Sequence, residues 1–321
     1  MRNKMKAMVI YEPGGPEKFV LEERAIPSVK EGWTLVKIKG FGINHSEIFT
    51  RKGLSPTVQF PRILGIECVG QVVETTRRGL QEGQKIVSIM GEMGRAYDGF
   101  YAEYVLLPNE QIYPVDSQLS WAELAAIPET YYTAFGSFKN MQIKEGDSIL
   151  VRAATSGVGL AFLKLVKAQF PQNRVVGSVR SLAKKDLLQQ QGFDEIILDE
   201  RGVLQTEEKF DKILELVGPA TLKNSFDHIQ SAGIICNTGQ LGGKWYVEEF
   251  DPIVEIRNNS YLTSFYSGNV HQQLIDELFS YIDAYKINVS PQRIFSLEQI
   301  PAAHSYIESQ AGFGKVVVLN N

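Results

Sequence analysis

One stretch of the sequence, residues 147–168, constrains the fold of this chain more than any other. It begins with a short apolar run, Ile149–Val151, whose β-branched residues predict a strand, and a turn of small residues follows. From about Gly157 the apolar residues recur at helical spacing, which predicts an amphipathic helix that ends before Pro171. A strand, a tight turn and a helix in this order form the first unit of a dinucleotide-binding sheet, because the helix N-terminus offers free N–H groups to a pyrophosphate.

The glycine pattern of this turn is incomplete. Where the dinucleotide fingerprint reads G-x-G-x-x-G, the chain has Ala154-Thr155-Ser156-Gly157-Val158-Gly159, and only the last glycine, which lets the helix pack closely on the strand, is in place. A tight turn of an unrelated α/β domain is therefore an alternative on these residues alone. Taken as a nucleotide site, the turn predicts cofactor contacts from Thr155, Ser156, Gly157, Val158 and Gly159.

The composition excludes several classes of protein. The chain has 321 residues, 44% of them hydrophobic and 22% charged, as expected for a soluble protein with two domains. Its net charge is −4 and no basic block occurs, so nothing predicts a nucleic-acid partner. We find no apolar run of membrane-spanning length and no signal peptide, and therefore expect no membrane partner and a cytoplasmic location. Cys68 and Cys236 are far apart and predict buried free thiols, because two cysteines cannot form a four-cysteine zinc site.

Two kinds of pattern divide the chain. Residues 1–125 carry many short strand-like segments separated by Gly and Pro, which predicts a compact β-rich domain. Helical patterns begin at a capping box formed by Ser120 and Glu123. From Ser148 on, strands and helices alternate, as in a doubly wound parallel sheet. Six strands are expected there, over residues 148–152, 174–179, 195–198, 212–216, 233–238 and 260–265.

The end of the chain predicts a helix over residues 270–285, a strand over 293–296, a helix over 300–310 and a strong terminal strand over 314–319. A six-stranded sheet that is already complete has no place for the terminal strand, so we expect this segment to return to the first domain. The predicted fold class is α/β. Its β-rich domain comprises residues 1–125 and 266–321, and its dinucleotide-binding domain, with six parallel strands, comprises residues 126–265.

With these patterns in place, the chain resembles the zinc-independent quinone oxidoreductase branch of the medium-chain dehydrogenase/reductase superfamily. The resemblance extends over nearly the whole chain and rests on short motifs in a fixed order. They are Gly42-Ile43-Asn44, PRILGIE from Pro61 to Glu67, DGFYAEY from Asp98 to Tyr104, Tyr132-Thr133-Ala134, AATSGVG from Ala153 to Gly159, and GKVVV from Gly314 to Val318. The resemblance implies a GroES-like, β-rich catalytic domain split around a Rossmann domain.

The resemblance also implies what this chain lacks. In zinc-dependent relatives a cysteine occupies the position of Asn44 and a histidine that of Ile66. A catalytic zinc needs three protein ligands of the Cys, His or carboxylate type, whereas Ile66 offers none and an amide is a poor ligand. His45 and Glu67 are nearby in the sequence but do not complete a set of three, so we expect no metal.

Asn44, His45 and Arg51 are the candidate catalytic residues. The amide of Asn44 has donors for a carbonyl oxygen or for the nicotinamide ribose, although an Asn in this Gly-Ile-Asn sequence is equally typical of a turn. His45 either donates a proton or packs against the loop. Arg51 either matches a basic position of the family pattern or is a solvated surface arginine. Phe49 stands where relatives often carry tyrosine, which removes one possible acid.

The residues after the second strand of the dinucleotide-binding domain predict the cofactor. NAD sites place an acidic residue there, about 20 residues past the glycine turn, to accept a hydrogen bond from the ribose 2′-hydroxyl. This chain has Ser178, Arg180 and Lys184 instead, with no carboxylate before Asp186. An arginine with a nearby lysine and serine suits a 2′-phosphate, so we expect NADPH. The alternative is a basic first turn on an exposed helix.

Further cofactor contacts are expected from a helix and from strand ends, because the carboxyl ends of parallel strands face the ligand crevice. Small residues at these places permit close approach of the cofactor, with core packing as the alternative, chiefly for Val217. The residues are Thr133, Val217, Gly218, Thr238 and Gly239.

Together these features predict an NADPH-dependent oxidoreductase that transfers a hydride, without zinc, to a quinone or to an activated, conjugated carbonyl or alkene. Without a metal or an evident acid–base pair, the acceptor should be one that takes up hydride readily. A zinc-type alcohol dehydrogenase and a non-catalytic NADPH-binding regulatory protein are the alternatives. A homodimer is expected through residues 260–265, because an unpaired apolar edge strand is an aggregation hazard that pairing of two copies removes.

Overall fold

The chain forms two compact units in a computed structural model that describes residues 4–309 and 311–320. The first unit consists of the described residues of the segments 1–130, 268–279 and 289–321. The second unit consists of residues 131–267 and 280–288. The beginning and the end of the chain thus belong to one unit. Helix α8 (Gln272–Ala284) is divided between the two units.

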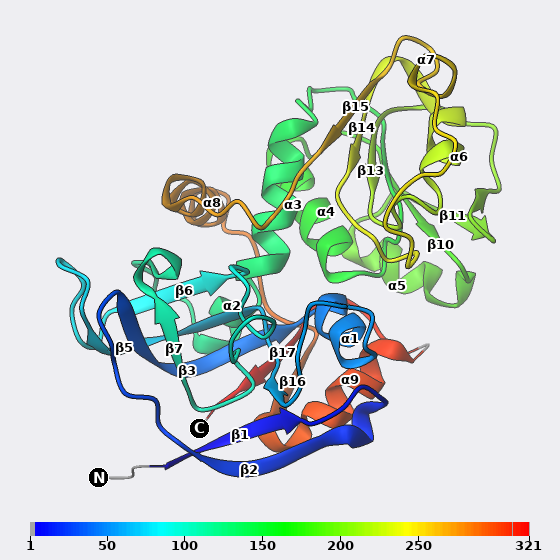
Figure 1. The fold of residues 1–321 in the computed structure, drawn as a ribbon. Helices are drawn as coiled ribbons and strands as arrows, with labels where there is room; N and C mark the ends of the chain where they lie inside the picture. Colours follow the sequence, from blue (N-terminus) through cyan, green and yellow to red (C-terminus); the bar gives the residue numbers. More distant parts are fainter. Residues whose placement is uncertain (1–3, 310, 321) are drawn as a thin grey trace. The chain divides into compact units, whose positions relative to one another are not determined.

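The first unit is built on two β-sheets (Figure 1). The smaller sheet has three strands in the order β2 (Phe19–Ala25), β1 (Lys4–Ile10) and β4 (Arg62–Ile63). The larger sheet follows the order β16 (Arg293–Ser296), β17 (Val316–Leu319), β3 (Trp33–Ile43), β5 (Glu67–Thr75), β6 (Lys85–Ile89) and β8 (Tyr113–Pro114), with β7 (Tyr104–Pro108) paired to β3. The terminal strand β17 lies antiparallel to β3 and is flanked on its other side by β16, so the last strand of the chain is built into the larger sheet.

Strand β3 is the centre of the larger sheet because it changes partner along its length. On one side it pairs with β5. On the other it pairs with β7 from Trp33 to Lys37 and with β17 from Gly40 to Ile43. A register shift against β5 between Ile38 and Gly40 marks the change, as expected for a bulge that bends a strand. The second half of β3 thus lies between β17 and β5 in the sheet.

Short helices complete the first unit. They are α1 (His45–Arg51), α2 (Trp121–Ala125) and α9 (Ile300–Glu308), with the 3-10 helices η1 (Pro16–Lys18), η2 (Asn109–Gln111) and η4 (Leu297–Gln299). The predicted capping box begins α2, since the Ser120 hydroxyl accepts the Glu123 N–H at 3.3 Å and the Glu123 carboxylate accepts the Ser120 N–H at 2.9 Å. Helix α1 was not predicted, because its seven residues are too few for a helical period to be recognised.

The second unit is a doubly wound Rossmann sheet. Its order is β12 (Val203–Leu204), β11 (Glu195–Glu200), β10 (Val175–Val179), β9 (Ile149–Val151), β13 (Phe210–Glu215), β14 (Ile229–Asn237) and β15 (Tyr261–Ser264). Apart from β12, all strands are parallel, in the 3-2-1-4-5-6 order of dinucleotide-binding domains. The six predicted strands are confirmed, and Figure 1 shows β13, β14 and β15 side by side.

The sheet has one more strand than these six, because β11 is followed by a short antiparallel strand, β12. Glu200 pairs with Val203, which leaves a two-residue turn formed by Arg201 and Gly202. Both turn residues have positive φ, 54° and 89°, as the central residues of a type I′ turn require. An arginine at the first central position gives no sequence signal for such a turn, and the strand β12 therefore escaped prediction.

The helices of the second unit include the one that the sequence marked most strongly. That helix is α4 (Gly157–Gln169), which begins at the predicted residue and buries Ala161, Phe162 and Leu165. The others are α3 (Pro128–Asn140), most of which belongs here, α5 (Lys185–Gln191), α6 (Leu222–Asp227) and α7 (Pro252–Glu255), with the 3-10 helix η3 (Leu182–Lys184). Both cysteines are buried free thiols, as predicted.

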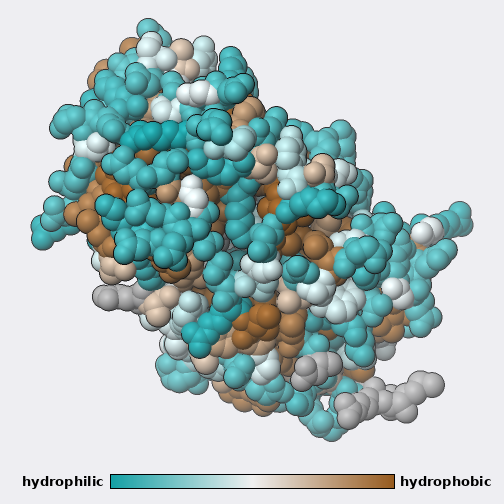
Figure 2. Space-filling view, turned by 180° about the vertical axis from the view of Figure 1, so that it is seen from behind, coloured by the Kyte–Doolittle hydropathy of each residue, from teal (hydrophilic) through white to brown (hydrophobic). Residues whose placement is uncertain are grey.

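Apolar side chains reach the surface in separate places. Figure 2 shows them as brown areas within a face that is mostly hydrophilic. Among the most exposed are Ile253 and Tyr246 of the second unit, at 92% and 70%. In the part of the chain that the structure describes, no helix has the length and apolar character needed to cross a membrane.

Candidate functional site

A buried charged cluster lies in the first unit, where β3, β5 and β17 come together. The Lys315 ammonium lies 2.5 Å from Glu67 Oε1 and 2.8 Å from Asn44 Oδ1. Asn44 Nδ2 donates to the same Glu67 oxygen at 2.8 Å, and Glu67 Oε2 accepts the backbone N–H of Glu129 at 2.8 Å. Glu67 is fully buried, Lys315 is 7% exposed and Asn44 is half-buried, so the cluster is most open to solvent at Asn44. We call these three residues the Asn44–Glu67–Lys315 cluster.

Strand pairing brings the three residues together from distant parts of the sequence. Val316 of β17 pairs with Ile43 of β3. Because the two strands are antiparallel, the next residues along, Lys315 and Asn44, lie beside each other. Glu67 opens β5 on the other side of β3. A Cβ atom at Gly42 would overlap Glu67 Oε1 and Lys315 Nζ. With a larger residue at this position, Glu67 or Lys315 would have to move from its place in the ion pair.

The cluster also determines the orientation of the Asn44 amide. Its oxygen faces the Lys315 ammonium and its nitrogen faces the Glu67 carboxylate. The opposite orientation would set two donors against each other and two acceptors against each other. Within the cluster, Asn44 thus uses one of its two N–H donors and Lys315 uses two of its three.

A second buried carboxyl group, Glu47 of α1, is coupled to this cluster. It is 1% exposed and accepts the backbone N–H groups of Asn44 at 3.2 Å and of Ile66 at 3.4 Å. Burial, and then repulsion from Glu67, raises the pKa of Glu47 from 4.5 to about 8, although Lys315 opposes the rise. At neutral pH Glu47 is therefore protonated, and the buried charges of Glu67 and Lys315 balance each other.

The structure separates the three candidate catalytic residues. Asn44 belongs to the cluster, whereas His45 is exposed at the first position of α1. Arg51, at the other end of α1, is 1% exposed and donates to Glu308 Oε2 at 2.6 Å and to the Gly14 carbonyl oxygen at 3.1 Å. The surface-arginine alternative is therefore wrong. Because its donors join α1 to α9 and to the residues before η1, the geometry favours a structural role for Arg51 over contact with a substrate.

A neutral histidine extends this Arg51 contact. His304 of α9 is fully buried, with Nδ1 3.3 Å from an Arg51 nitrogen and Nε2 2.8 Å from the Tyr101 hydroxyl. Burial, and then the charge of Arg51, lowers the pKa of His304 to about 3. Since arginine only donates, Nδ1 must be the acceptor and Nε2 must carry the proton that faces Tyr101. This histidine stays neutral at physiological pH and is part of the packing between α1 and α9.

In the second unit, most of the predicted cofactor residues gather at one edge of the sheet. The turn after β9 and the segments after β10, β13 and β14 all follow the carboxyl ends of neighbouring parallel strands. The winding reverses between β9 and β13, and sheets of this kind bind ligands at such a switch point. The residues at this edge are Thr155, Ser156, Gly157, Val158, Gly159, Ser178, Arg180, Val217, Gly218, Thr238 and Gly239.

The turn after β9 is held by its own hydrogen bonds. Ser156 is the N-cap of α4, and its hydroxyl accepts the Gly159 N–H at 3.0 Å. A Cβ atom at Gly159 would lie 3.0 Å from the Ala153 carbonyl oxygen, which agrees with the close packing expected of the last glycine. Gly157 and Val158, as the first residues of the helix, have N–H groups without an intrahelical acceptor. The turn therefore keeps two donors for an anion while Ser156 is used within it.

At the end of β10, Ser178 is 1% exposed, and its hydroxyl has no hydrogen-bond partner among the described residues. A buried hydroxyl without a partner costs free energy, which points to a polar ligand at this place. Arg180 is exposed, and Lys184 in η3 is half-buried, with its pKa lowered by that burial. Both basic residues lie on the segment where the ribose of a dinucleotide is recognised in this fold.

Two of the predicted cofactor residues, Gly218 and Gly239, are explained by contact with each other. Gly218 has a φ of 87°, and a Cβ atom there would overlap the carbonyl oxygen of Gly239. Glu215 Oε1 accepts the N–H groups of Val217 at 2.9 Å and of Gly218 at 3.0 Å, which holds this turn in place. The packing alternative thus accounts for both glycines, and their contact with a cofactor stays a prediction.

Thr133 and Thr238 are joined through Ser137 of α3. The Ser137 hydroxyl donates to the Thr133 carbonyl oxygen at 2.8 Å and lies 2.9 Å from the Thr238 hydroxyl. Beside Thr238, the side-chain oxygen of Asn237 is buried without a partner among the described residues. Ser178 and Asn237, which lie at the carboxyl ends of β10 and β14, thus each have a buried polar atom without a partner among the described residues. A polar ligand would satisfy them, so the residues of this edge fit a dinucleotide.

Sequence reasoning missed a buried ionic network at the same edge. Arg152, directly after β9, is fully buried, with its guanidinium 2.5 Å from Asp199 and 3.7 Å from Glu215. Because Glu215 also binds the backbone of the turn after β13, Arg152 supports that turn indirectly. The only signal in the sequence was an arginine and a glutamate at the ends of apolar strand runs. Neither residue type is normally buried without a partner.

The donor set of the first unit does not suit a divalent metal. Across residues 4–309 and 311–320, no three His, Cys, Asp or Glu side chains are grouped so that they could hold a metal ion. Ile66 has no atom that could bind a metal. Asn44 Oδ1 and Glu67 Oε1 already accept hydrogen bonds from the Lys315 ammonium, and Glu67 Oε2 accepts the Glu129 N–H. A second cation at that place would be repelled by the first.

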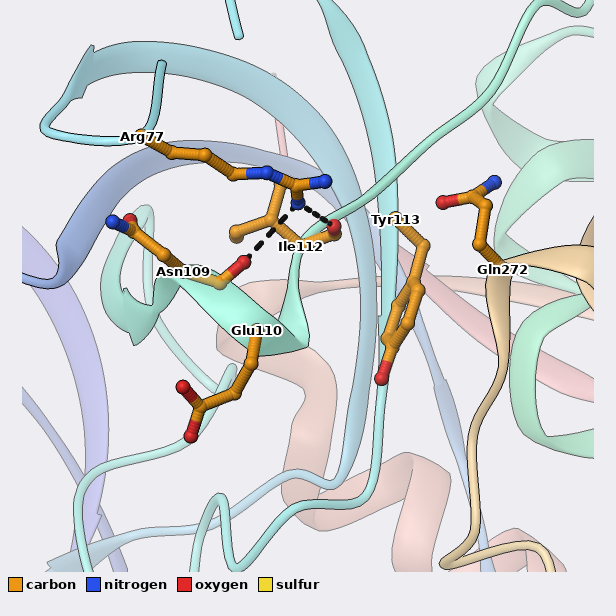
Figure 3. Close-up of a pocket in the computed structure, with 6 residues that line it drawn as sticks. All are labelled: Arg77, Asn109, Glu110, Ile112, Tyr113 and Gln272. Atoms are coloured by element: carbon orange, nitrogen blue, oxygen red, sulfur yellow. Dashed lines mark hydrogen bonds between the residues drawn. The ribbon is translucent and has the colours of Figure 1, made fainter. Parts of the chain in front are cut away.

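An open pocket with a volume of about 380 Å³ lies elsewhere in the first unit (Figure 3). The Arg77 guanidinium donates there to the carbonyl oxygens of Ile112 at 2.6 Å and of Asn109 at 3.2 Å, so its charge holds the chain before β8. The pocket shares no residue with the Asn44–Glu67–Lys315 cluster. It is lined by Arg77, Asn109, Glu110, Ile112, Tyr113 and Gln272.

A GroES-like β-rich unit together with a Rossmann unit defines the class of pyridine-nucleotide-binding dehydrogenases and reductases with two domains. Comparison with known proteins agrees with this class. The family model described as an alcohol dehydrogenase GroES-like domain matches residues 30–117, and the one described as a zinc-binding dehydrogenase matches residues 191–318. The chain belongs to the medium-chain dehydrogenase/reductase superfamily of oxidoreductases and is a quinone-oxidoreductase-like member of it.

Individual relatives are distant but extend over nearly the whole chain. A quinone oxidoreductase of Sus scrofa is 23% identical over 98% of this chain and 98% of its own length. A 2-methylene-furan-3-one reductase of Solanum lycopersicum is 25% identical over 98% of this chain and 79% of its own length. The structure of a mycobacterial protein solved with NADPH has a TM-score of 0.82 at 23% identity, over 98% of this chain and 100% of that one, and shows the same fold.

Proposed function

We propose that this protein transfers a hydride from NADPH to a quinone or to a conjugated carbonyl or alkene, without zinc. The observation that carries the proposal is the Asn44–Glu67–Lys315 cluster. In it, the Lys315 ammonium binds the two side-chain oxygens that would otherwise be available as metal ligands. An amide and an ammonium stabilise a negative oxygen by hydrogen bonds, which suffices for an acceptor that already delocalises the incoming charge. A simple ketone needs the stronger polarisation that zinc enzymes obtain from the metal.

The names of two relatives support this choice of acceptor. A quinone and a 2-methylene-furan-3-one both contain a C=C bond conjugated to a carbonyl group. The nucleotide, when bound, supplies the hydride. The chain's own part is to bind and orient it, with the turn after β9 for the pyrophosphate and with Ser178, Arg180 and Lys184 for a 2′-phosphate. We extend the proposal to a cytoplasmic, homodimeric protein.

The acceptor class is tested by steady-state NADPH oxidation with a quinone, an enone and a simple ketone. We expect turnover with the first two, and we expect Asn44→Ala to lower it while the affinity for NADPH changes little. Metal analysis of the dialysed protein should find far less than one zinc per chain, and a chelator should leave the activity unchanged. A preference for the ketone, stoichiometric zinc or an unchanged Asn44→Ala rate would contradict the proposal.

The cofactor is tested by comparing the affinities for NADPH and NADH. Arg180→Glu should remove a charge-assisted contact and repel the 2′-phosphate. The binding free energy of NADPH should therefore become less favourable by roughly 1.5–3 kcal/mol. The affinity for NADH, which has no 2′-phosphate, serves as the control and should change much less. Equal affinities of the wild-type protein for the two nucleotides would rule out the NADPH preference.

Two alternatives remain open to the same measurements. A zinc-type alcohol dehydrogenase agrees with the description of one matching family model, and it predicts bound zinc and ketone turnover. A non-catalytic NADPH-binding regulatory protein predicts tight NADPH binding without oxidation by any acceptor. A cofactor titration beside the turnover assay separates this second alternative from an enzyme.

A further inference from the structure

Two hydrogen-bond donors of the Asn44–Glu67–Lys315 cluster are left over. An ammonium group has three N–H bonds, and Lys315 uses one toward Glu67 and one toward Asn44. The amide of Asn44 has two, and one is used toward Glu67. Within the described residues, the structure gives neither remaining N–H bond an acceptor in the protein. One positively charged donor and one neutral donor are thus available.

The nitrogen atoms that carry these two donors are held close together. Both nitrogen atoms bond the same oxygen, Glu67 Oε1, at 2.5 and 2.8 Å, and the lysine also bonds the amide oxygen. The second oxygen of Glu67 is occupied by the Glu129 backbone N–H. Glu67 therefore acts as a positioning residue. Preorganised donors of this kind stabilise an oxygen that becomes negative during a reaction.

We propose that Lys315 and Asn44 form an oxyanion site for the acceptor, with Lys315 as the residue that returns a proton to the acceptor oxygen. The inference rests on the proposed function, since it assigns residues to the acceptor side of that reaction. Once the acceptor has gained a hydride, its oxygen carries the negative charge. An N–H bond of Lys315 breaks as the O–H bond forms, the lysine is left as a neutral amine, and a proton from solvent restores the ammonium.

The environment suits this exchange. The half-buried Asn44 gives access to the cluster, while the 7% exposure of Lys315 keeps its charge poorly screened by water. The carboxylate of Glu67 holds the lysine in place through an ion pair, and Gly42 leaves the space in which the pair forms. A neutral acceptor whose oxygen becomes an enolate or a hydroquinone anion matches the site. An acceptor without such an oxygen gains nothing from it.

The test uses the full-length protein without nucleotide and 4-nitrophenol as the probe, because its phenolate imitates the reduced oxygen and absorbs separately from the phenol. We expect the wild-type protein to bind the phenolate and to lower the pKa of the bound phenol. Lys315→Met alone would bury an unpaired Glu67 and risk misfolding, so the informative variant is Lys315→Met with Glu67→Gln. Its affinity for the phenolate should fall roughly tenfold to hundredfold.

Lys212→Met is the matched control, because Lys212 is also 7% exposed but lies on β13 of the second unit. It should leave phenolate binding unchanged, and Lys315→Arg should retain most of it. Equal phenolate affinity of the wild-type protein and the double variant, or no binding by the wild type, would overturn the inference. Titration with NADPH measures cofactor binding and so tests the proposed function independently of the oxyanion site. Lysine-dependent phenolate binding without NADPH binding refutes the function alone, and NADPH turnover with lysine-independent phenolate binding refutes the oxyanion site alone.

Discussion

Replacing Glu47 by Gln should change how the stability of the first unit depends on pH. The folded protein holds a proton on Glu47 up to a pKa of about 8, whereas the unfolded chain releases it near 4.5. Between these values the folded state binds one proton more, so the free energy of unfolding falls as the pH rises. The shift of about 3.5 pH units, at roughly 1.4 kcal/mol each, sets a loss of up to about 5 kcal/mol across this window.

Glu47→Gln removes this loss because an amide does not titrate. The difference in unfolding free energy between variant and wild type should therefore grow in favour of the variant from about pH 4.5 to about pH 8, and then stay constant. Other groups titrate in both proteins and cancel in the difference. The loss of one acceptor for the backbone N–H groups of Asn44 and Ile66 adds a constant cost that does not depend on pH.

The assay is urea unfolding followed by tryptophan fluorescence at a series of pH values. Trp33 and Trp121 lie in the first unit and Trp245 lies in the second, so a Trp245→Phe background reports on the first unit alone. Glu110→Gln, at an exposed position of the same unit, is the control and should run parallel to the wild type. A Glu47→Gln curve that also runs parallel would show that Glu47 is ionised in the folded protein, which would refute the reasoning from burial.

Two further predictions concern packing and assembly. Gly42→Ala should destabilise the first unit by about 1–3 kcal/mol, because the added methyl group overlaps the Lys315–Glu67 pair, and the cost should shrink in the Lys315→Met, Glu67→Gln background. Urea unfolding of the four proteins measures this coupling, and an equal cost in both backgrounds would show that the pair is not what Gly42 accommodates. The protein should be a dimer through β15, which ends the Rossmann sheet with Tyr261 and Leu262 exposed at 61% and 38%. Light scattering at micromolar concentration should give twice the chain mass, and Leu262→Lys should shift it toward the monomer; a monomeric wild type would remove the basis for this assembly.

Most of the Rossmann unit could be predicted from the sequence, because the patterns that mark its strands and helices lie in short, continuous segments. The run Ile149–Val151, the small-residue turn and the helix from Gly157 follow one another directly, and each is marked by its own periodicity. The alternation of strands and helices then predicted the six parallel strands. Only β12 was missed, since it depends on the positive φ of Arg201, which no residue type announced.

The candidate site was visible only as separate motifs. Asn44 was recognised as a candidate, while Glu67 was considered only as an incomplete metal ligand, and Gly42 and Lys315 were part of motifs without an assigned role. Arg51 was considered for catalysis because of its place in a motif, but its contacts with Glu308 come from a helix at the far end of the chain. Such partners cannot be read from residue spacing, because they depend on which strands pair and in what register.

What the sequence by itself determined about this protein is its fold class and the residue types available for chemistry. The tertiary structure alone decided that β17 lies against β3, and thereby that an ammonium group meets Asn44 and Glu67. It also decided the protonation of Glu47, since desolvation arises from segments that are distant in sequence. The physical reason is the same in both cases: local patterns fix the periodicity of a segment, whereas charge and proton affinity depend on everything packed around it.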